Sequence, residues 1–222
     1  YDHVFTYGGG SAVVEAFRAL GARDCEPVYN ALDPETHGPA RPEPRFSADL
    51  SLLANRLPDR EARVEEFFFR AARLSPAARF LLAGSGWDPA AVPRNVRAIG
   101  HLGTGDHDAF NASCRAVLNV TRQDMAETGY SPATRVFEAA GAGACLVSDD
   151  WPGLSAFLEP GAEVLVARDG ADVAEHLAGL DAATARRIGT AARARILAEH
   201  TYAIRAAAVD RRLKRLLIAT RA

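Results

Sequence analysis

Short apolar runs alternate along the chain with segments whose apolar positions recur every three or four residues. Runs of the first kind predict buried strands, and segments of the second kind predict amphipathic helices. Strands are expected at 3–7, 25–29, 50–54, 79–83, 96–99, 116–120, 145–147 and 163–166. Because helical segments separate most of these runs, the pattern predicts an α/β fold with a Rossmann-like, doubly wound parallel sheet.

The helical pattern and the prolines suggest how the chain is divided. Helices are expected at 11–20, 59–74, 108–113, 132–142 and 171–180, and the stretch 182–221 has the pattern of two helices interrupted near His200. Residues 31–46 contain four prolines and few large apolar side chains, which indicates a linker. We therefore expect three parts: residues 1–46 as the end of an N-terminal domain with its linker, 47–200 as the main domain, and 201–222 as a C-terminal helix.

Composition narrows the class of protein. The 222 residues are 48% hydrophobic and 24% charged, which suits a globular protein with a sizeable core. A formal net charge of −2 argues against a nucleic-acid partner. The odd number of cysteines, three, favours reduced thiols and a cytoplasmic protein.

Since no apolar run approaches the roughly 20 residues that cross a bilayer, no transmembrane segment is expected. The chain starts at Tyr1 just before a strand-like run, which suggests a part of a larger protein.

The most informative stretch is 129–143. Ser131 is a good N-cap and Pro132 a good first helical residue, while Gly141 and Gly143 predict the end of the helix before the next strand. The start of such a helix lies at the carboxyl edge of the sheet. Its free N–H groups and partial positive charge favour a bound diphosphate there.

Two charged residues on this helix have complementary chemistry. Arg135 and Glu138 are three positions apart and so share one face, where a guanidinium could hold phosphate oxygens and a carboxylate could accept hydrogen bonds from ribose hydroxyls. The alternative is an ion pair on a solvated face, worth a few tenths of a kcal/mol, and spacing alone favours it.

The stretch also resembles a known family. Gly129-Tyr130-Ser131-Pro132, then 135–140 with the sequence Arg-Val-Phe-Glu-Ala-Ala, then Gly143, is similar to the motif of the CgeB-like glycosyltransferases, which are GT-B enzymes. Further similar stretches follow in order at 55–60, 84–87, 100–102, 150–153 and 200–202. The resemblance implies a hexosyltransferase-like enzyme whose donor is a nucleotide diphosphate sugar. It also implies that residues 1–46 belong to an N-terminal domain that binds an unknown acceptor, and that this domain is needed for activity.

The resemblance further implies a set of site residues. Glu138 would hold the donor ribose, and Arg56 and Arg60 would neutralise the diphosphate. Arg60 is the preferred phosphate ligand; the alternative is that it is a surface arginine at the start of a helix. In the retaining enzymes of this class, a glutamate that contacts the donor sugar stands eight positions before Glu138. Tyr130 stands there in this chain, so neither retention nor inversion is implied. The nucleotide-sugar-binding residues expected are Arg56, Arg60, Gly100, His101, Leu102, Tyr130, Ser131, Thr134, Arg135 and Glu138.

No cofactor or metal ion is expected for the reaction. Residues 106–108, Asp-His-Asp, lack zinc-like spacing, and GT-B enzymes dispense with a metal. The pair Asp149-Asp150 is predicted to lie in a loop bordering the cleft, with Asp150 as a sugar contact. The three glycines at 8–10 lack the third glycine of a dinucleotide motif, because Val13 stands in its place, and they favour a tight turn.

Two other functions remain open from the sequence. The same two-domain plan could serve a nucleotide-sugar epimerase or a phosphorylase, since fold does not fix reaction. Alternatively, a chain without the earlier glutamate could be a non-catalytic nucleotide-sugar-binding or assembly protein.

Overall fold

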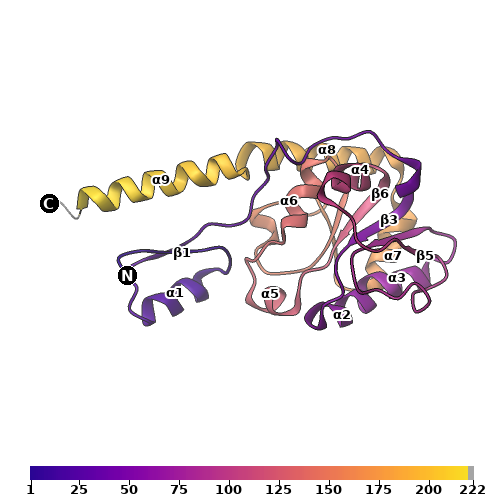
Figure 1. Cartoon of the computed structure of the whole chain (residues 1–222), viewed down its shortest axis with the longest axis horizontal. Coiled ribbons are helices and arrows are strands. Elements are labelled where there is room, and N and C mark those ends of the chain that lie inside the picture. The colour runs from indigo at the N-terminus through magenta and orange to yellow at the C-terminus, as the bar shows by residue number, and fades with distance from the viewer. Residues whose placement is uncertain (220–222) are drawn as a thin grey trace.

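The computed structural model describes residues 1–219 and contains two parallel sheets (Figure 1). The larger sheet has the order β5-β4-β3-β6-β7-β8, and every neighbouring pair is parallel. Its strands are β3 (Ala48–Leu53), β4 (Phe80–Ala83), β5 (Val96–Ala98), β6 (Cys114–Asn119), β7 (Leu146–Asp149) and β8 (Leu165–Ala167). In the smaller sheet, β1 (Val4–Thr6) pairs with β2 (Cys25–Pro27). The predicted α/β class and doubly wound parallel sheet are confirmed, with strand ends displaced by one or two residues.

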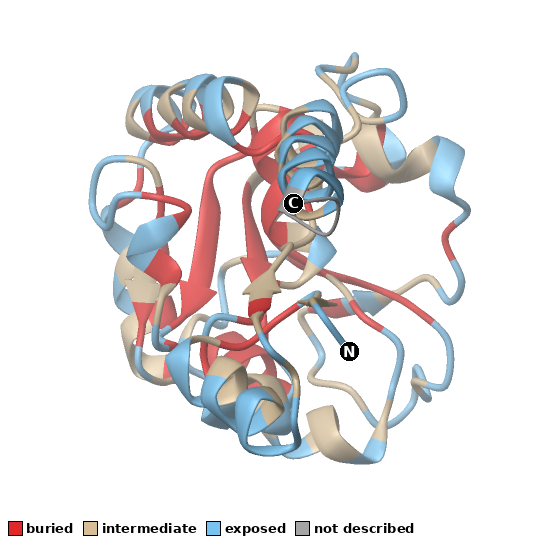
Figure 2. Ribbon diagram, turned by 90° about the vertical axis from the view of Figure 1, so that its left-hand side faces the viewer, coloured by how far each residue is buried: buried red, intermediate tan, exposed pale blue. Residues whose placement is uncertain are grey.

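Helices cover both faces of the larger sheet, and the strands between them are buried (Figure 2). Successive strand residues point to opposite faces. Leu50 and Leu118 therefore pack in one apolar cluster with Phe68, whereas Val117 packs in another with Phe137. Burial on both faces explains why these strands are continuous apolar runs in the sequence.

The predicted helices are present with adjusted bounds. The segment predicted at 59–74 consists of α2 (Pro58–Val64), a π-helical turn (Glu65–Phe69) and α3 (Arg70–Leu74). The others are α1 (Ser11–Ala19), α4 (His107–Ala112), α6 (Thr134–Gly141), α7 (Gly170–Gly179), α8 (Ala182–Glu199) and α9 (Tyr202–Ala219). A further helix, α5 (Gln123–Thr128), was not predicted, because none of its side chains is buried and it has no apolar stripe. Positions 220–222, the predicted end of the last helix, lie outside the described residues.

The prediction that Ser131 caps a helix is wrong. Helix α6 begins at Thr134, its N-cap position is Ala133, and no side chain caps it. The Ser131 hydroxyl instead accepts a hydrogen bond from the Gly9 N–H, at 3.1 Å, and donates one to the Gly129 carbonyl, at 3.0 Å. A partner 122 residues away in sequence has displaced the local capping contact.

The linker joins the smaller unit (β1, α1 and β2) to the larger one, and α9 contacts the smaller unit from the end of α8. In the linker, the Leu32 N–H donates to the His200 carbonyl at 2.8 Å, and the Leu32 carbonyl accepts from the Tyr202 N–H at 2.9 Å. Helix α9 then runs back along the smaller unit (Figure 1), where Arg212 forms ion pairs with Asp24 and Glu26. The linker and the α8–α9 junction thus lie side by side.

His200 occupies a buried position at this junction. Its ring packs near Phe137 and Phe157, and its Nδ1 lies 2.7 Å from a guanidinium nitrogen of Arg205. Burial, together with the positive charges of Arg205 and Arg195, lowers the pKa of His200 to about 4. His200 and Thr201 are thus packed in the interior at this junction, whereas Tyr202 is exposed.

This burial predicts a pH-dependent stability. Unfolded His200 takes up a proton near pH 6.5 and folded His200 only near pH 4, so its contribution is complete above about pH 6.5 and is lost as the pH falls toward 4. The loss is on the order of 3 kcal/mol of unfolding free energy. We expect His200→Asn, which keeps an acceptor for Arg205, to flatten the profile in urea denaturation between these pH values. Parallel profiles for the variant and the parent would contradict the assignment.

Candidate functional site

A cleft of about 320 Å³ lies at the carboxyl edge of the larger sheet. The chain order runs from β3 outward to β4 and β5, and then from β6 outward to β7 and β8, so β3 and β6 flank the point where the sheet changes direction. Open α/β sheets bind ligands at this position. The cleft is lined by Leu52, Leu53, Ala54, Asn55, Arg60, Gly84, His101, Leu102, Thr104, His107, Leu118, Asn119, Val120, Ala133, Thr134 and Arg135.

The first turn of α6 forms one wall of this cleft. Ala133, Thr134 and Arg135 line it, and no side chain caps the helix. The N–H groups at the start of a helix have no partner within the helix, and the helix dipole places partial positive charge there. An anion in the cleft would meet both the N–H groups and this charge.

Two arginines bring further positive charge to the same cleft. The Arg135 side chain is only 13% exposed, and its Nε has no hydrogen-bond partner within residues 1–219, while its Nη1 is ion-paired with Glu138. The Nε of Arg60 is also buried and has no hydrogen-bond partner among the residues that the structure describes. Burial lowers the pKa of Arg135, and the nearby Arg60 lowers it further against the opposing effect of Glu138. An anionic group between the two guanidinium groups would remove both the repulsion and the missing hydrogen bonds.

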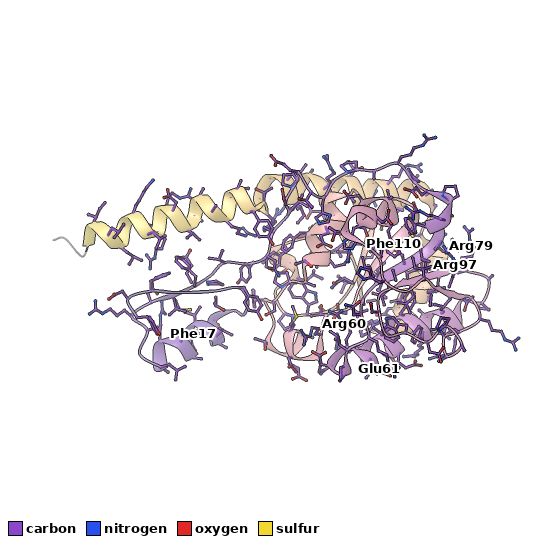
Figure 3. The ribbon with its side chains drawn as sticks, in the orientation of Figure 1. Phe17, Arg60, Glu61, Arg79, Arg97 and Phe110 are labelled. Carbon is purple, nitrogen blue, oxygen red and sulfur yellow. The ribbon has the colours of Figure 1, made fainter. Side chains whose placement is uncertain are left out.

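Arg60 is held near the sheet by its neighbours on α2. In Figure 3 Arg60 lies toward the middle of the larger unit, whereas the adjacent Glu61 lies at its lower edge. One turn along, Arg63 donates to the Asp149 carboxylate at 2.5 Å and to the Thr121 carbonyl at 2.8 Å. These bonds fix the first helical turns of α2 against the carboxyl ends of β6 and β7.

Asp149 is the centre of this network, and its predicted place in a loop is wrong. It is the last residue of β7 and is fully buried. One carboxylate oxygen accepts hydrogen bonds from the Thr121 N–H and hydroxyl and from the Asn119 amide, while the other accepts from Arg63. Burial raises the pKa of Asp149, and the charge of Arg63 opposes that rise. Asp150, the next residue, is exposed.

Glu138 lies beside Arg135 on the second turn of α6. Its carboxylate is 3.0 Å from an Arg135 nitrogen, and its side chain is 16% exposed. The ion pair that the spacing favoured is therefore present, but it is largely shielded from solvent. His37 and His107 each approach the same carboxylate to 3.9 Å.

The loops after β4 and β5 close the opposite side of the cleft. Gly84 has φ +130°, and a Cβ there would lie 2.0 Å from the Ala54 carbonyl, so only glycine fits this approach. The Gly84 N–H donates to the Gly100 carbonyl at 2.7 Å. This contact places the predicted His101 and Leu102 along the cleft, with His101 exposed and Leu102 buried.

Five predicted residues are not part of the cleft lining: Gly100 and Glu138 adjoin it, whereas Arg56, Tyr130 and Ser131 lie apart from it. Arg56 lines a separate cleft and forms an ion pair with Glu61 at 2.5 Å. Tyr130 and Ser131 face the N-terminal glycines: the Tyr130 carbonyl accepts from the Gly9 N–H at 2.8 Å, and a Cβ on Gly10 would lie 2.7 Å from the Tyr130 ring. Tyr130 also has a left-handed backbone, with φ 45°.

The structure brings three more residues to this region, of which only His107 was considered from the sequence, and only as a metal ligand. Asn119 lines the cleft from the end of β6, and His107 lines it from the first turn of α4. A polar residue at the end of a buried strand, as Asn119 is, was a usable signal. His37 had none, because it contacts Glu138 from the linker, and a contact so distant in sequence leaves no local pattern.

Comparisons with known proteins agree with this geometry. A family model described as "Glycosyl transferase-like" matches residues 60–211. No curated protein matches the sequence. Among residues 1–219, no helix combines the length and the apolar character required to span a membrane.

Several solved structures share the fold at low sequence identity. Sucrose-phosphate synthase from Thermosynechococcus elongatus is 16% identical with a TM-score of 0.71, over 98% of this chain and 59% of that one. Anabaena Alr3699/HepE, solved with UDP and glucose, is 13% identical with a TM-score of 0.73, over 96% and 63%. A glycosyltransferase from Rickettsia africae ESF-5 is 9% identical with a TM-score of 0.69, over 97% and 64%. The chain thus spans about three fifths of the length of these proteins.

Proposed function

The chain belongs to the glycosyl transferase-like family, and on that premise we propose that it supplies the donor site of an enzyme that transfers a sugar from a nucleotide diphosphate sugar. One observation carries the proposal. The uncapped start of α6 and two arginines whose Nε atoms have no hydrogen-bond partner among the described residues, Arg60 and Arg135, belong to one cleft at the switch point of the sheet. That combination suits a diphosphate.

Each part of the donor has a partner in this proposal. The diphosphate lies at the start of α6, where Arg60 and Arg135 stabilise the negative charge that develops as the sugar leaves. Glu138 accepts hydrogen bonds from the ribose hydroxyls, and the nucleobase lies along Gly100, His101 and Leu102. The complexes of Anabaena Alr3699/HepE with UDP and with UDP-glucose support a nucleotide sugar as the ligand of this fold.

The remaining features of the reaction are proposals about the whole protein. An N-terminal domain, whose end is residues 1–46, binds the acceptor and supplies any base that activates the acceptor hydroxyl. The reaction needs no metal ion. Within the glycosyl transferase-like family, the motif at 129–143 assigns the protein to the CgeB-like enzymes. A cytoplasmic location is supported by the three free thiols, of which Cys25 and Cys145 are buried.

Calorimetry with UDP, GDP and TDP, and with their sugars, tests the proposal. We expect one nucleotide diphosphate to bind with a stoichiometry of one, and its crystal complex to contain the diphosphate at the start of α6. Absence of binding by all of them would overturn the donor site. Donor hydrolysis without transfer by the full-length protein would favour the epimerase or phosphorylase alternative.

The ribose role of Glu138 gives a sharper prediction. A nucleotide that lacks the ribose hydroxyls should bind about ten- to a hundredfold more weakly than its parent, because hydrogen bonds to a charged group contribute about 1.5–3 kcal/mol. In Glu138→Gln the ratio between the affinities for the two nucleotides should be smaller. Calorimetry with both nucleotides on the parent and on the variant measures this ratio. An equal preference in the variant would place the ribose elsewhere.

A further inference from the structure

Three side chains from separate segments meet beside the donor cleft. His37 comes from the linker, His107 from the first turn of α4 and Glu138 from α6, and one donor atom of each lies within 4.8 Å of the other two. All three are half-buried, and His107 also lines the cleft.

The orientation of His37 is set by Asp108. Its Nδ1 lies 3.3 Å from one Asp108 oxygen, and the other Asp108 oxygen accepts from the Gly38 N–H at 3.0 Å. A carboxylate facing Nδ1 requires the proton on that nitrogen, so the neutral ring has its lone pair on Nε2. That Nε2 faces a Glu138 oxygen at 3.9 Å.

His107 is arranged in the same manner. The Leu102 backbone favours its protonated form, while its Nδ1 is buried and has no hydrogen-bond partner among the described residues. Nδ1 faces the second Glu138 oxygen at 3.9 Å, so a neutral ring with its proton on Nε2 has its lone pair on Nδ1. Two lone pairs thus face a carboxylate with no proton between them. An outer carboxylate or carbonyl that fixes the tautomer is the usual surrounding of a metal-bound histidine.

The distances and the ligand types favour a zinc-like ion. Two imidazoles and a carboxylate are ligands that Zn²⁺ accepts in three-residue sites with a fourth, open position. In such a tetrahedral site the ligand atoms lie about 3.3 Å apart. The two imidazoles face different Glu138 oxygens, and one donor atom of each residue lies within 4.8 Å of the other two, so the widest separation has to close by up to about 1.5 Å. Arg135 opposes a cation here, because it lies 3.0 Å from the Glu138 oxygen that faces His107.

We propose that His37, His107 and Glu138 bind one Zn²⁺-class ion, and that this ion antagonises donor binding. The antagonism rests on the proposed function, because the ion takes the carboxylate that the ribose requires and brings positive charge next to Arg135. The ion is then an inhibitor that ties the linker to α6, and it takes no part in the transfer.

Metal titration of the chain without nucleotide tests the site itself. We expect one Zn²⁺ per chain by competition with a chromogenic chelator, and a tetrahedral absorption band with Co²⁺. His37→Gln and His107→Gln should each weaken binding at least about tenfold, and Asp108→Asn about ten- to a hundredfold by releasing the His37 ring. His176→Gln is the matched control, since His176 lies on α7 and contacts the Val166 carbonyl. Circular dichroism verifies the fold of each variant. Zn²⁺ affinity that is equal in the parent and in His37→Gln would overturn the proposal.

Nucleotide titration with and without Zn²⁺ tests the antagonism. We expect saturating Zn²⁺ to weaken UDP binding at least about tenfold in the parent and to leave it unchanged in His37→Gln. Unchanged UDP affinity in a zinc-loaded parent would overturn the antagonism. Failure of UDP, GDP and TDP to bind in the absence of Zn²⁺ would overturn the proposed function alone, because the metal titration does not depend on a nucleotide.

Discussion

Replacing Arg135 by alanine is expected to weaken nucleotide diphosphate binding by about a hundredfold or more. Its Nε has no hydrogen-bond partner among the described residues, and the guanidinium is largely shielded from solvent, so its bonds to phosphate oxygens would be charge-assisted and weakly screened. Two such bonds at about 1.5–3 kcal/mol each account for the loss. Calorimetry with the nucleotide that binds most tightly gives the measurement.

Two further variants separate this effect from a general disturbance. Arg135→Lys keeps the charge but not the planar fork, and we expect an intermediate loss of about tenfold. Arg79→Ala should bind as the parent does, because Arg79 is exposed and precedes β4 at the opposite edge of the sheet (Figure 3). If Arg135→Ala binds within threefold of the parent while its melting temperature is unchanged, the diphosphate lies elsewhere.

The second large effect concerns stability. Asp149→Ala should lower the free energy of unfolding by about 3–5 kcal/mol, because it leaves the shielded Arg63 guanidinium without its counter-ion. The Thr121 N–H and the Asn119 amide also lose their acceptor. Denaturation in urea at pH 7 measures the change.

The partner of Asp149 provides the control. If the unpaired charge causes the loss, Arg63→Met combined with Asp149→Ala should be more stable than Asp149→Ala alone, which a double-mutant cycle expresses as a coupling energy. Asp149→Asn keeps an acceptor for Thr121 and should cost less. A loss below 1 kcal/mol in Asp149→Ala would show that the network does not stabilise the fold.

The fold was predictable because its signal is local. Strands such as β4 are buried on both faces, so their residues form unbroken apolar runs. The strand ends differ by one or two residues, since hydrogen bonding rather than hydrophobicity sets them. Helix α5 escaped prediction because it has no buried residue, and hydrophobic periodicity is the signal on which such predictions depend.

The site was predictable only in part. Arg60, Thr134 and Arg135 line the cleft, because a position at a strand end or a helix start already places a residue at the sheet edge. Ser131 and Tyr130 have the same local signal, yet they contact the glycines at 8–10. The role of Asp149 depends on Arg63, 86 residues away in sequence, and that of His37 on Asp108. Pairings across such separations are set by the tertiary fold.

The paired hydrogen bonds of Leu32 with residues 200–202 have a mechanical consequence. The linker, which is the covalent connection between the two units, and the start of α9, which returns along the smaller unit, meet in this one short backbone ladder, so it acts as a pivot. Rotation about the ladder preserves its bonds, whereas translation or a swing in another direction breaks them. Rotation about the ladder is therefore the motion we expect of the small unit, and it would break the contacts of the glycines at 8–10 with the loop that precedes α6.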